Sequence, residues 1–241
     1  MIRHQIEQAL KGFIAHTILD IGPGLSNYSH LVSKMTHATH ITYLDVDQEV
    51  LDYQAEEAYK AGLDVECLRA NLDIDGLTSI TTLFDIILCQ EVLEHLHNAD
   101  EILATLAKLL TPKGKIIITV PTKISERWLK FLNPMYMRNE PYGHVREFDV
   151  KGLKQILDEA GLYPIVFLHN QPHYFICQSW LMVSRMAVDG SRGSVSTTDW
   201  RYVVFTKLCA YSLKFFLLTN YRFWARVFPR NYFVVATLKQ S

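Results

Sequence analysis

Residues 16–26 read HTILDIGPGLS, and this stretch decides how the rest of the chain is interpreted. An apolar run ends in an acid, Asp20, and is then broken by two glycines, Gly22 and Gly24. The pattern after them is helical, so we expect a strand, a tight turn and the N-terminus of a helix. Glycine has no side chain, and the first backbone amides of a helix are open to a ligand. The stretch is therefore typical of a turn on which a ligand lies against the backbone.

The composition is that of a globular chain. It has 241 residues, of which 49% are hydrophobic and 20% charged, and this fits one α/β domain with an elaboration. Residues 1–11 carry several charges and no uninterrupted apolar core, so we do not expect a signal peptide. Cysteines at 67, 89, 177 and 209 form no CxxC or zinc-type spacing. Reduced thiols in a cytoplasmic protein are the interpretation that this pattern favours.

Short apolar segments alternate with helical patterns along the chain. Strands are expected up to residue 21 and at 40–44, 65–68, 84–89, 115–120, 162–169 and 233–238. Helices are expected at 1–11, 27–36, 48–61, 99–110, 124–138 and 149–160, and a turn at 112–114. Several of the strands are apolar on both faces, which predicts a mostly parallel sheet with helices on both faces. Ligands of such sheets bind outside the carboxyl ends of the strands.

Asp45 follows the second expected strand, 21 residues beyond Gly24. A carboxylate at this place can accept hydrogen bonds from both hydroxyls of a ribose. The alternative is a solvated acid at a strand end. The third glycine of the dinucleotide fingerprint is absent, because Ser26 stands at the next alternate position. That absence disfavours an NAD(P)-dependent oxidoreductase.

Five stretches resemble the class I S-adenosylmethionine-dependent methyltransferases. They are ILDIGPGLS at 18–26, YLDVD at 43–47, FDIILCQEVLEHLHN at 84–98, LLTPKGKIIITVP at 109–121 and GHVREFDVKGLKQILDEAGL at 143–162. The chain is most similar to the branch that contains quinone-biosynthesis, small-molecule and glycan methyltransferases, from which Pro23 and Ser26 depart. The resemblance implies a Rossmann-like sheet of seven strands with an antiparallel final strand.

The resemblance also implies which residues contact the cofactor, S-adenosylmethionine, and its product S-adenosylhomocysteine. Asp20, Gly22 and Gly24 are expected along the methionine end, with Gln90 and Glu91 near its amino group. Asp45 is expected at the ribose, and Val46 against the adenine. The set is completed by Asn71, whose amide oxygen would accept from the adenine amine, and by Leu72.

Titratable residues gather where the fourth and fifth strands end. They are Glu91, Glu94, His95, His97 and His144. A base is needed when the methyl acceptor is a hydroxyl, and His144, His95 and Glu94 are the catalytic candidates. A similar ExxEH motif with a distant histidine binds a divalent metal in some relatives, so Glu91, Glu94, His95 and His144 are also metal candidates; the sequence favours the metal less than the base. The third interpretation is structural, with Glu94 and His95 pairing at a helix start.

Residues 171–230 are an expected helical insertion before the last strand, outside a core of residues 1–170 and 231–241. From residue 200 to the end the chain has seven Lys/Arg and no Asp/Glu, and 12 of its 28 aromatic residues. An amphipathic helix on the core, contact of residues 200–230 with an anionic membrane surface, and grip on a lipid-linked substrate all remain open. A spanning helix is disfavoured by Lys207 and Lys214. The acidic remainder of the chain argues against nucleic acid as a partner.

These observations predict a methyltransferase that acts on an oxygen of a small molecule, a glycan or a lipid-linked intermediate. It would be cytoplasmic, either free or peripheral at the inner membrane surface. C- or N-methylation in the same fold is the first alternative, and a non-catalytic cofactor-binding or scaffold protein is the second.

Overall fold

A computed structural model describes residues 2–77, 80–134, 143–183 and 200–240. The chain divides into two compact units. The first comprises Met1–Val120, Val150–Phe167 and Phe233–Ser241, and the second comprises Pro121–Asp149 and Leu168–Tyr232.

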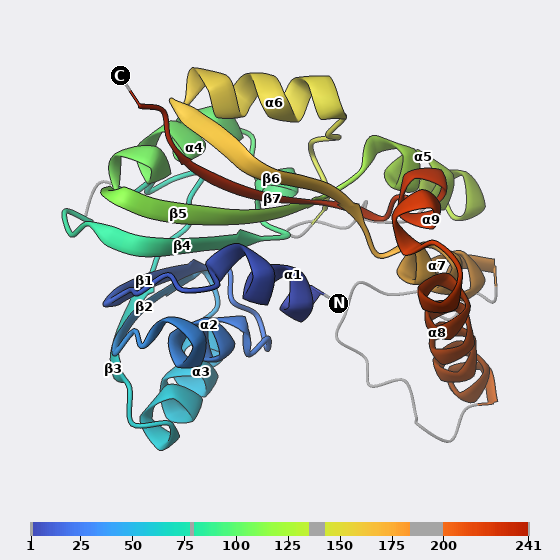
Figure 1. Cartoon of the computed structure of the whole chain (residues 1–241), viewed down its shortest axis with the longest axis horizontal. Coiled ribbons are helices and arrows are strands. Elements are labelled where there is room, and N and C mark those ends of the chain that lie inside the picture. The colour runs from blue at the N-terminus through green and yellow to red at the C-terminus, as the bar shows by residue number, and fades with distance from the viewer. Residues whose placement is uncertain (1, 78–79, 135–142, 184–199, 241) are drawn as a thin grey trace. The chain divides into compact units, whose positions relative to one another are not determined.

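The first unit is built around the sheet, whose strands run in the order β3-β2-β1-β4-β5-β7-β6 (Figure 1). The strands are β1 Thr17–Ile21, β2 His40–Asp45, β3 Asp64–Arg69, β4 Phe84–Gln90, β5 Leu110–Pro121, β6 Leu162–Asn170 and β7 Asn231–Leu238. Neighbouring strands from β3 to β5 pair in parallel, and the last strand is antiparallel. The predicted fold class is therefore confirmed. The strand order reverses beside β1, where Ile21 pairs with Leu44 on one side and Cys89 on the other.

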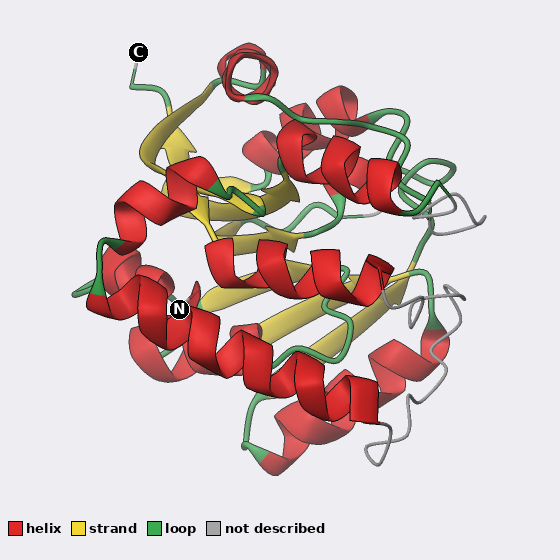
Figure 2. Cartoon of the chain, turned by 90° about the vertical axis from the view of Figure 1, so that its right-hand side faces the viewer, coloured by secondary structure: helices red, strands yellow, loops and turns green. Residues whose placement is uncertain are grey.

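Helices cover both faces of the sheet (Figure 2). Those of the first unit are α1 Ile2–Leu10, α2 Tyr28–Thr36, α3 Gln48–Lys60, the short 3-10 helix η1 Leu93–His95, α4 Ala99–Lys108 and α6 Val150–Glu159. Their apolar residues recur at helical spacing; α1, for example, buries Ile2, Ile6 and Leu10. The central strands β1, β2 and β4 are buried on both sides, whereas the edge strand β3 is largely exposed. This core fixes the strand ends that carry the polar residues.

The helix expected at 124–138 is shorter than predicted, since α5 Lys123–Leu132 ends before Asn133, and residues 135–138 lie outside the described residues. A second local prediction was wrong. Residues 112–114 form no separate turn but belong to β5, which is longer than expected. Phe84 pairs with Leu110 and Ile86 with Lys115, so β5 holds extra residues in a bulge. Gly114 suits the bulge, since a Cβ there would lie 3.0 Å from the Phe84 carbonyl oxygen. A bulge and a turn have similar composition, and the sequence does not separate them.

The second unit contains α5 Lys123–Leu132, α7 Pro172–Val183, α8 Trp200–Leu218 and α9 Tyr221–Val227. It includes residues 121–149, which the sequence analysis assigned to the core. The reason is the contact between α5 and α7: the Trp128 ring stacks on Phe175, and Trp128 Nε1 donates to Ser179 Oγ at 2.9 Å. The expected division of function between 171–230 and the rest stays a prediction. Among the described residues, no helix has both the length and the apolar character to cross a membrane.

Candidate active site

The glycine turn after β1 has the backbone that its sequence predicts. Gly22 and Gly24 have φ angles of 59° and 54°, in the region that side chains disfavour. A Cβ on Gly22 would lie 2.6 Å from Val92 Cγ2, and the Gly22 amide donates to the Leu44 carbonyl at 2.8 Å. The turn is thus held between the ends of β2 and β4, at the point where strand order reverses.

Gln54 supports this turn from α3, and the sequence analysis did not find it. Its side chain is fully buried, and Nε2 donates to the carbonyl oxygens of Gly24 at 2.8 Å and Ser26 at 2.9 Å. A signal was present, because Gln54 is the polar member of the buried helical face that also contains Val50, Leu51 and Ala58. Its partners lie 30 and 28 residues away, so the sequence does not name them.

Asp20 is 2% exposed at the end of β1. Its Oδ2 atom is buried and has no hydrogen-bond partner among the described residues, while Ser29 hydrogen-bonds the side chain. Burial, with the nearby charge of Asp45, raises the pKa of Asp20 to about 7. Ser29 also begins a hydrogen-bond chain: its Oγ lies 3.2 Å from the Tyr43 hydroxyl, which lies 3.1 Å from His30 Nε2. A buried carboxyl oxygen without a partner suits a cationic ligand group.

Asp45 and Val46 lie at the end of β2, as predicted. Asp45 Oδ1 accepts from the Asp47 amide at 3.0 Å, and burial, opposed by such amide bonds, raises the pKa of Asp45. Asp47 begins α3, where its carboxylate accepts from the Glu49 amide at 2.9 Å. Val46 is 41% exposed for an apolar residue at a strand end. The pair therefore offers a carboxylate beside an exposed apolar surface.

Asn71 and Leu72 follow β3. The carboxamide oxygen of Asn71 accepts from the Asp73 amide at 3.0 Å, which occupies one of its two lone pairs. Leu72 is buried. Asp73 ties this segment to the loop after β4, since it accepts from the His97 amide at 2.9 Å and lies 3.1 Å from His97 Nδ1. His97 is thus a structural partner of this loop.

Gln90 and Glu91 end β4. Gln90 Oε1 is buried and has no hydrogen-bond partner in the part of the chain that the structure describes. Glu91 has a φ of 55°, a strained value for a residue with a side chain, and its amide donates to the Thr119 carbonyl at 2.8 Å. Such strain is concentrated at functional sites, and here it turns the chain sharply at the carboxyl end of β4.

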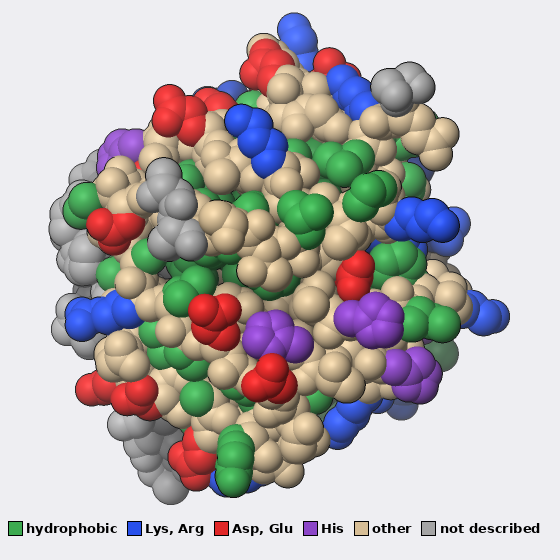
Figure 3. All heavy atoms as spheres, turned by 90° about the vertical axis from the view of Figure 1, so that its left-hand side faces the viewer, with side chains coloured by type: hydrophobic (Ala, Val, Ile, Leu, Met, Phe, Trp, Pro, Cys, Tyr) green, Lys and Arg blue, Asp and Glu red, His purple; other side chains and the backbone are tan. Residues whose placement is uncertain are grey.

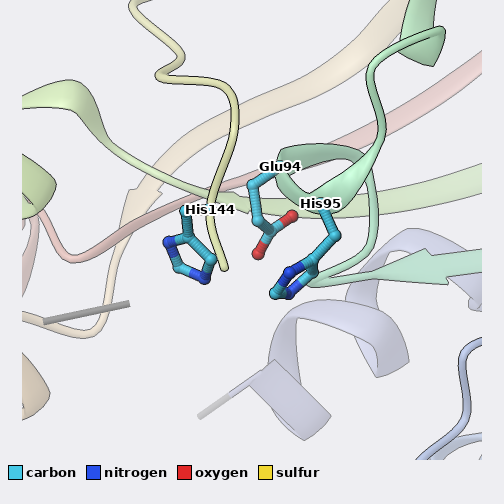
Figure 4. Close-up of side chains that lie close together, drawn as sticks. All are labelled: Glu94, His95 and His144. Carbon is cyan, nitrogen blue, oxygen red and sulfur yellow. The ribbon is translucent and has the colours of Figure 1, made fainter. Parts of the chain in front are cut away.

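Glu94 and His95 lie on η1, directly after this turn (Figure 4). Glu94 is 1% exposed and His95 is half-buried. Burial raises the pKa of Cys89 on β4, and the charge of Glu94 adds to the effect. Carboxylate and imidazole are therefore present in the first unit at a strand end, where ligands of this fold bind.

His144 belongs to the second unit, in the chain between α5 and α6 (Figure 4). Its Nδ1 lies 2.7 Å from Oε2 of Glu126, and both side chains are nearly inaccessible. Burial raises the pKa of Glu126, but the hydrogen bond with His144 and the charges of His144, Arg230 and Lys130 outweigh it, and the pKa is below its ordinary value. His144 is predicted as a site residue from the sequence, whereas Glu126 and Arg230 are not.

The four metal candidates divide between the two units. Glu91, Glu94 and His95 belong to the first and His144 to the second. Their convergence on one ion stays a prediction.

The first unit thus defines a class of protein. It is a doubly wound sheet with a glycine turn at the switch point, a buried carboxyl oxygen open to a cationic group, and a second carboxylate at the end of β2. These residues fit a nucleoside-type ligand with an amino-acid end: Asp20 and Gln90 each have a buried oxygen without a hydrogen-bond partner among the described residues, where that end would lie.

Comparisons with known proteins agree. The profile of the family described as "Methyltransferase domain" matches residues 2–165. A ubiquinone biosynthesis O-methyltransferase from Erwinia tasmaniensis is 24% identical over 174 residues, which cover 69% of this chain and 70% of the relative. The chain belongs to the methyltransferase domain family and is an S-adenosylmethionine-dependent methyltransferase, as its sequence predicts.

Solved structures show the same fold. A methyltransferase from Clostridium acetobutylicum that depends on S-adenosylmethionine has a TM-score of 0.60 at 10% identity, covering 99% of this chain and 90% of its own. A 4+2 cyclase, SpnF, has a TM-score of 0.62 at 16% identity, covering 100% of this chain and 81% of its own. These likenesses concern the fold alone.

Proposed function

We propose that the protein transfers a methyl group from S-adenosylmethionine to an oxygen of a small molecule, a glycan or a lipid-linked intermediate. The observation that carries the choice of oxygen is the supply of bases, foremost His144 held by a buried carboxylate. An alcohol or phenol must lose a proton when it is methylated, whereas a neutral amine attacks with its lone pair. The name of the relative from Erwinia tasmaniensis is consistent with this choice.

The first unit would bind the cofactor. Asp20, with Gly22 and Gly24 letting the backbone approach, would hold the methionine end, and its unpartnered oxygen would accept from the amino group. Gln90 and Glu91 complete that end. Asp45 would accept from the ribose hydroxyls and Val46 would lie against the adenine, with Asn71 and Leu72 at its edge.

When bound, S-adenosylmethionine would supply a methyl group from its sulfonium: the acceptor oxygen would bond to the methyl carbon as the carbon–sulfur bond breaks, with S-adenosylhomocysteine as the leaving group. His144 would accept the proton of the acceptor hydroxyl at Nε2, with Glu94 and His95 as the further candidates. Holding the reactants in position provides much of the remaining acceleration.

The direct test uses S-adenosylmethionine with a labelled methyl group and an extract of the native cell. We expect label in one fraction, as a methyl ether or ester. Ester label is released by mild base, whereas ether, N-methyl and C-methyl labels resist it and are distinguished by mass spectrometry. Label on nitrogen or carbon would replace the proposal by the first alternative. Binding of S-adenosylhomocysteine without any transfer would favour a scaffold.

Metal binding is the alternative role proposed for Glu91, Glu94, His95 and His144. Carboxylates and imidazoles are suitable ligands for Mg²⁺ or Zn²⁺. If a metal is required, dialysis against a chelator abolishes transfer and one of the two ions restores it. Activity that is indifferent to the chelator would leave His144 and His95 as base and substrate contact.

The second unit is proposed to contact an anionic membrane surface through α8 and α9. Tyr211, Leu218 and Phe223 are 71%, 75% and 53% exposed, and Lys207 and Lys214 share the exposed side of α8. Helix α8 turns Phe216 inward, so that the lysines and the apolar residues Tyr211 and Leu218 are all exposed. Exposed aromatic residues beside cations are typical of interfacial helices. The protein would then be cytoplasmic and peripheral, and the acceptor lipid-linked.

Sedimentation with vesicles tests this contact. Wild type should bind vesicles of phosphatidylglycerol more tightly than vesicles of phosphatidylcholine. The double variant Lys207→Glu/Lys214→Glu should lose at least about tenfold in affinity, since each charge near such a surface contributes about 1 kcal/mol. Lys108→Glu/Lys113→Glu makes the same charge change at exposed positions of the first unit and should have little effect. Equal binding to both kinds of vesicle would remove the electrostatic contact.

Nucleic acid is not proposed as a partner, because acidic residues outnumber basic ones in residues 1–199. On the face drawn in Figure 3, acidic, basic and histidine side chains are interspersed. A face that follows a phosphate backbone carries clustered cations instead.

A further inference from the structure

Glu126 stands at an unusual place for an acid. It lies in the first turn of α5, and the side chain is 1% exposed. Thr122 is the N-cap of this helix, and its hydroxyl accepts from the Ser125 amide at 3.1 Å. A carboxylate near a helix N-terminus is stabilised by the helix dipole, but a buried charge also needs direct partners.

Both carboxylate oxygens have partners. Oε2 lies 2.7 Å from Nδ1 of His144, and Oε1 accepts from Nη1 of Arg230 at 3.3 Å. Both partners follow Glu126 in the sequence but are far apart from each other, since His144 is 18 residues from Glu126 and Arg230 is 104 residues from it. A guanidinium on one oxygen favours the ionised carboxylate, which has no proton to donate.

Arg230 is itself fixed against the start of α5. Its side chain is 6% exposed, and Nη1 also donates to Ser125 Oγ at 3.2 Å. Its carbonyl oxygen accepts from the Thr122 amide and from Ser125 Oγ, each at 2.9 Å. The Arg230 guanidinium is therefore placed by backbone contacts and not only by its attraction to Glu126.

The consequence concerns the tautomer of His144. Since an ionised carboxylate can only accept, the contact at 2.7 Å requires a hydrogen on His144 Nδ1. The lone pair of the neutral ring then lies on Nε2, the nitrogen that would take a proton or bind a metal. The carboxylate also fixes the plane of the ring.

We propose that Glu126 is a positioning residue for methyl transfer: it holds His144 in the Nδ1–H tautomer and in one orientation, and Arg230 holds Glu126. The inference rests on the proposed function in that His144 acts through Nε2, and it applies whether Nε2 accepts a proton or binds a metal. Glu126 itself contacts neither acceptor nor cofactor in this assignment.

Glu147 offers a matched control. It is a carboxylate of the same unit, three residues after His144, and it pairs with Arg127 at 3.1 Å and Lys130 at 3.2 Å. Glu147→Gln therefore makes the same chemical change as Glu126→Gln without altering the partner of His144.

The tautomer is read by nitrogen NMR of protein with labelled histidine, and the His144 signals are identified by their loss in His144→Gln. In wild type we expect Nδ1–H and an unprotonated Nε2 above the pH at which the ring is charged. Glu126→Gln should give a mixture of tautomers, because an amide both donates and accepts. Glu126→Asp, which keeps the charge, should restore the wild-type tautomer in part, and Glu147→Gln should leave it unchanged. An Nδ1–H tautomer that persists in Glu126→Gln would overturn the inference.

Kinetics separates positioning from stability. Glu126→Gln should lower kcat by about tenfold to a hundredfold, the usual cost of losing an orienting partner, with the affinity for S-adenosylhomocysteine within about twofold of wild type. Equal losses of kcat and of this affinity would indicate a structural role and contradict the proposal. If Glu126→Gln does not fold, Glu126→Ala, which also removes the carboxylate, takes its place in both measurements. An unchanged kcat together with an unchanged Nδ1–H tautomer in that variant would overturn the inference. The NMR result needs no acceptor, so a wild type without transferase activity refutes the proposed function while the tautomer still decides the positioning.

Discussion

Asp20 and Glu126 are buried carboxylates, one in each unit, and they differ in their partners. Asp20 leaves Oδ2 without a hydrogen-bond partner among the described residues, and its pKa is raised to about 7. Glu126 has a partner on each oxygen, and its pKa is below the ordinary value. A buried carboxylate with an oxygen that no group of the described chain hydrogen-bonds is suited to bind an external cation. A buried carboxylate with protein partners on both oxygens instead holds a neighbouring side chain in place.

The largest expected effect is on stability, with Asp20→Asn. The folded state holds the Asp20 proton more tightly than the unfolded state, so its contribution to stability is full below pH 3.8 and is lost as the pH rises to about 7. At pH 8, ionised Asp20 destabilises the fold by up to about 4 kcal/mol, and asparagine removes this penalty. In urea unfolding, the advantage of the variant should grow from pH 5 to pH 7 and then level off. If the difference in unfolding free energy between Asp20→Asn and wild type does not vary with pH, the protein itself stabilises ionised Asp20.

The same chemical change in the second unit should act in the opposite direction. Glu126→Gln leaves the buried Arg230 guanidinium without its carboxylate, and breaking a buried ion pair typically destabilises by about 3 kcal/mol. Glu147→Gln, which breaks partly exposed pairs with Arg127 and Lys130, should cost less than about 1 kcal/mol. Urea unfolding of both variants at pH 7 measures the contrast. A stabilised Glu126→Gln would erase the distinction between the two acids.

Cofactor affinity should depend on the first unit. Asp45→Ala removes the two charged hydrogen bonds expected at the ribose, and the affinity for S-adenosylhomocysteine should fall by about a hundredfold. Asp47→Ala is the matched control: it removes the cap of α3, which costs about 1 kcal/mol of stability, and leaves the affinity intact. Calorimetry on both variants gives the result. If Asp45→Ala and Asp47→Ala lose similar affinity, the residues at the end of β2 affect binding through the folding of α3 and not through contact with the ribose.

The pH dependence of binding should be smaller. With a pKa of about 7, Asp20 is mostly neutral at pH 6 and mostly ionised at pH 8, and the ionised form attracts the amino group of the ligand. The affinity for S-adenosylhomocysteine should therefore rise by about tenfold between these pH values, because ionisation of one group changes by that factor. In Asp20→Asn the affinity should be lower and independent of pH over this range. A wild type without pH dependence would place the amino group elsewhere.

The sequence predicted the parts of the structure that are locally encoded. The glycine turn, the acid at the end of β2 and the alternating order of strands depend on neighbouring residues, and they were found. The bulge in β5 was missed because Pro112 and Gly114 are equally typical of a turn. The sequence does not predict the outer side of α8, because this helix is apolar on nearly all sides and its pattern does not say which residues face inward.

The supporting residues were missed for a different reason. Arg230 meets Glu126 across 104 residues of chain, and Gln54 meets Gly24 across 30. No local pattern names such partners. A polar residue on the buried face of an amphipathic helix is the only signal, and both Gln54 and Glu126 give it.

Gln54 provides the finest test of how much the first unit owes to such support. Gln54→Leu keeps the apolar face of α3 but leaves the carbonyl oxygens of Gly24 and Ser26 without their buried donor. A turn held less firmly must be ordered by the ligand, so the affinity for S-adenosylhomocysteine should fall by about fivefold, equivalent to about 1 kcal/mol. Gln48→Leu, on the same helix, removes only an exposed bond to Asp52 and should leave the affinity unchanged. If the two variants bind alike, the glycine turn is stable without α3, and its conformation follows from Gly22 and Gly24 alone.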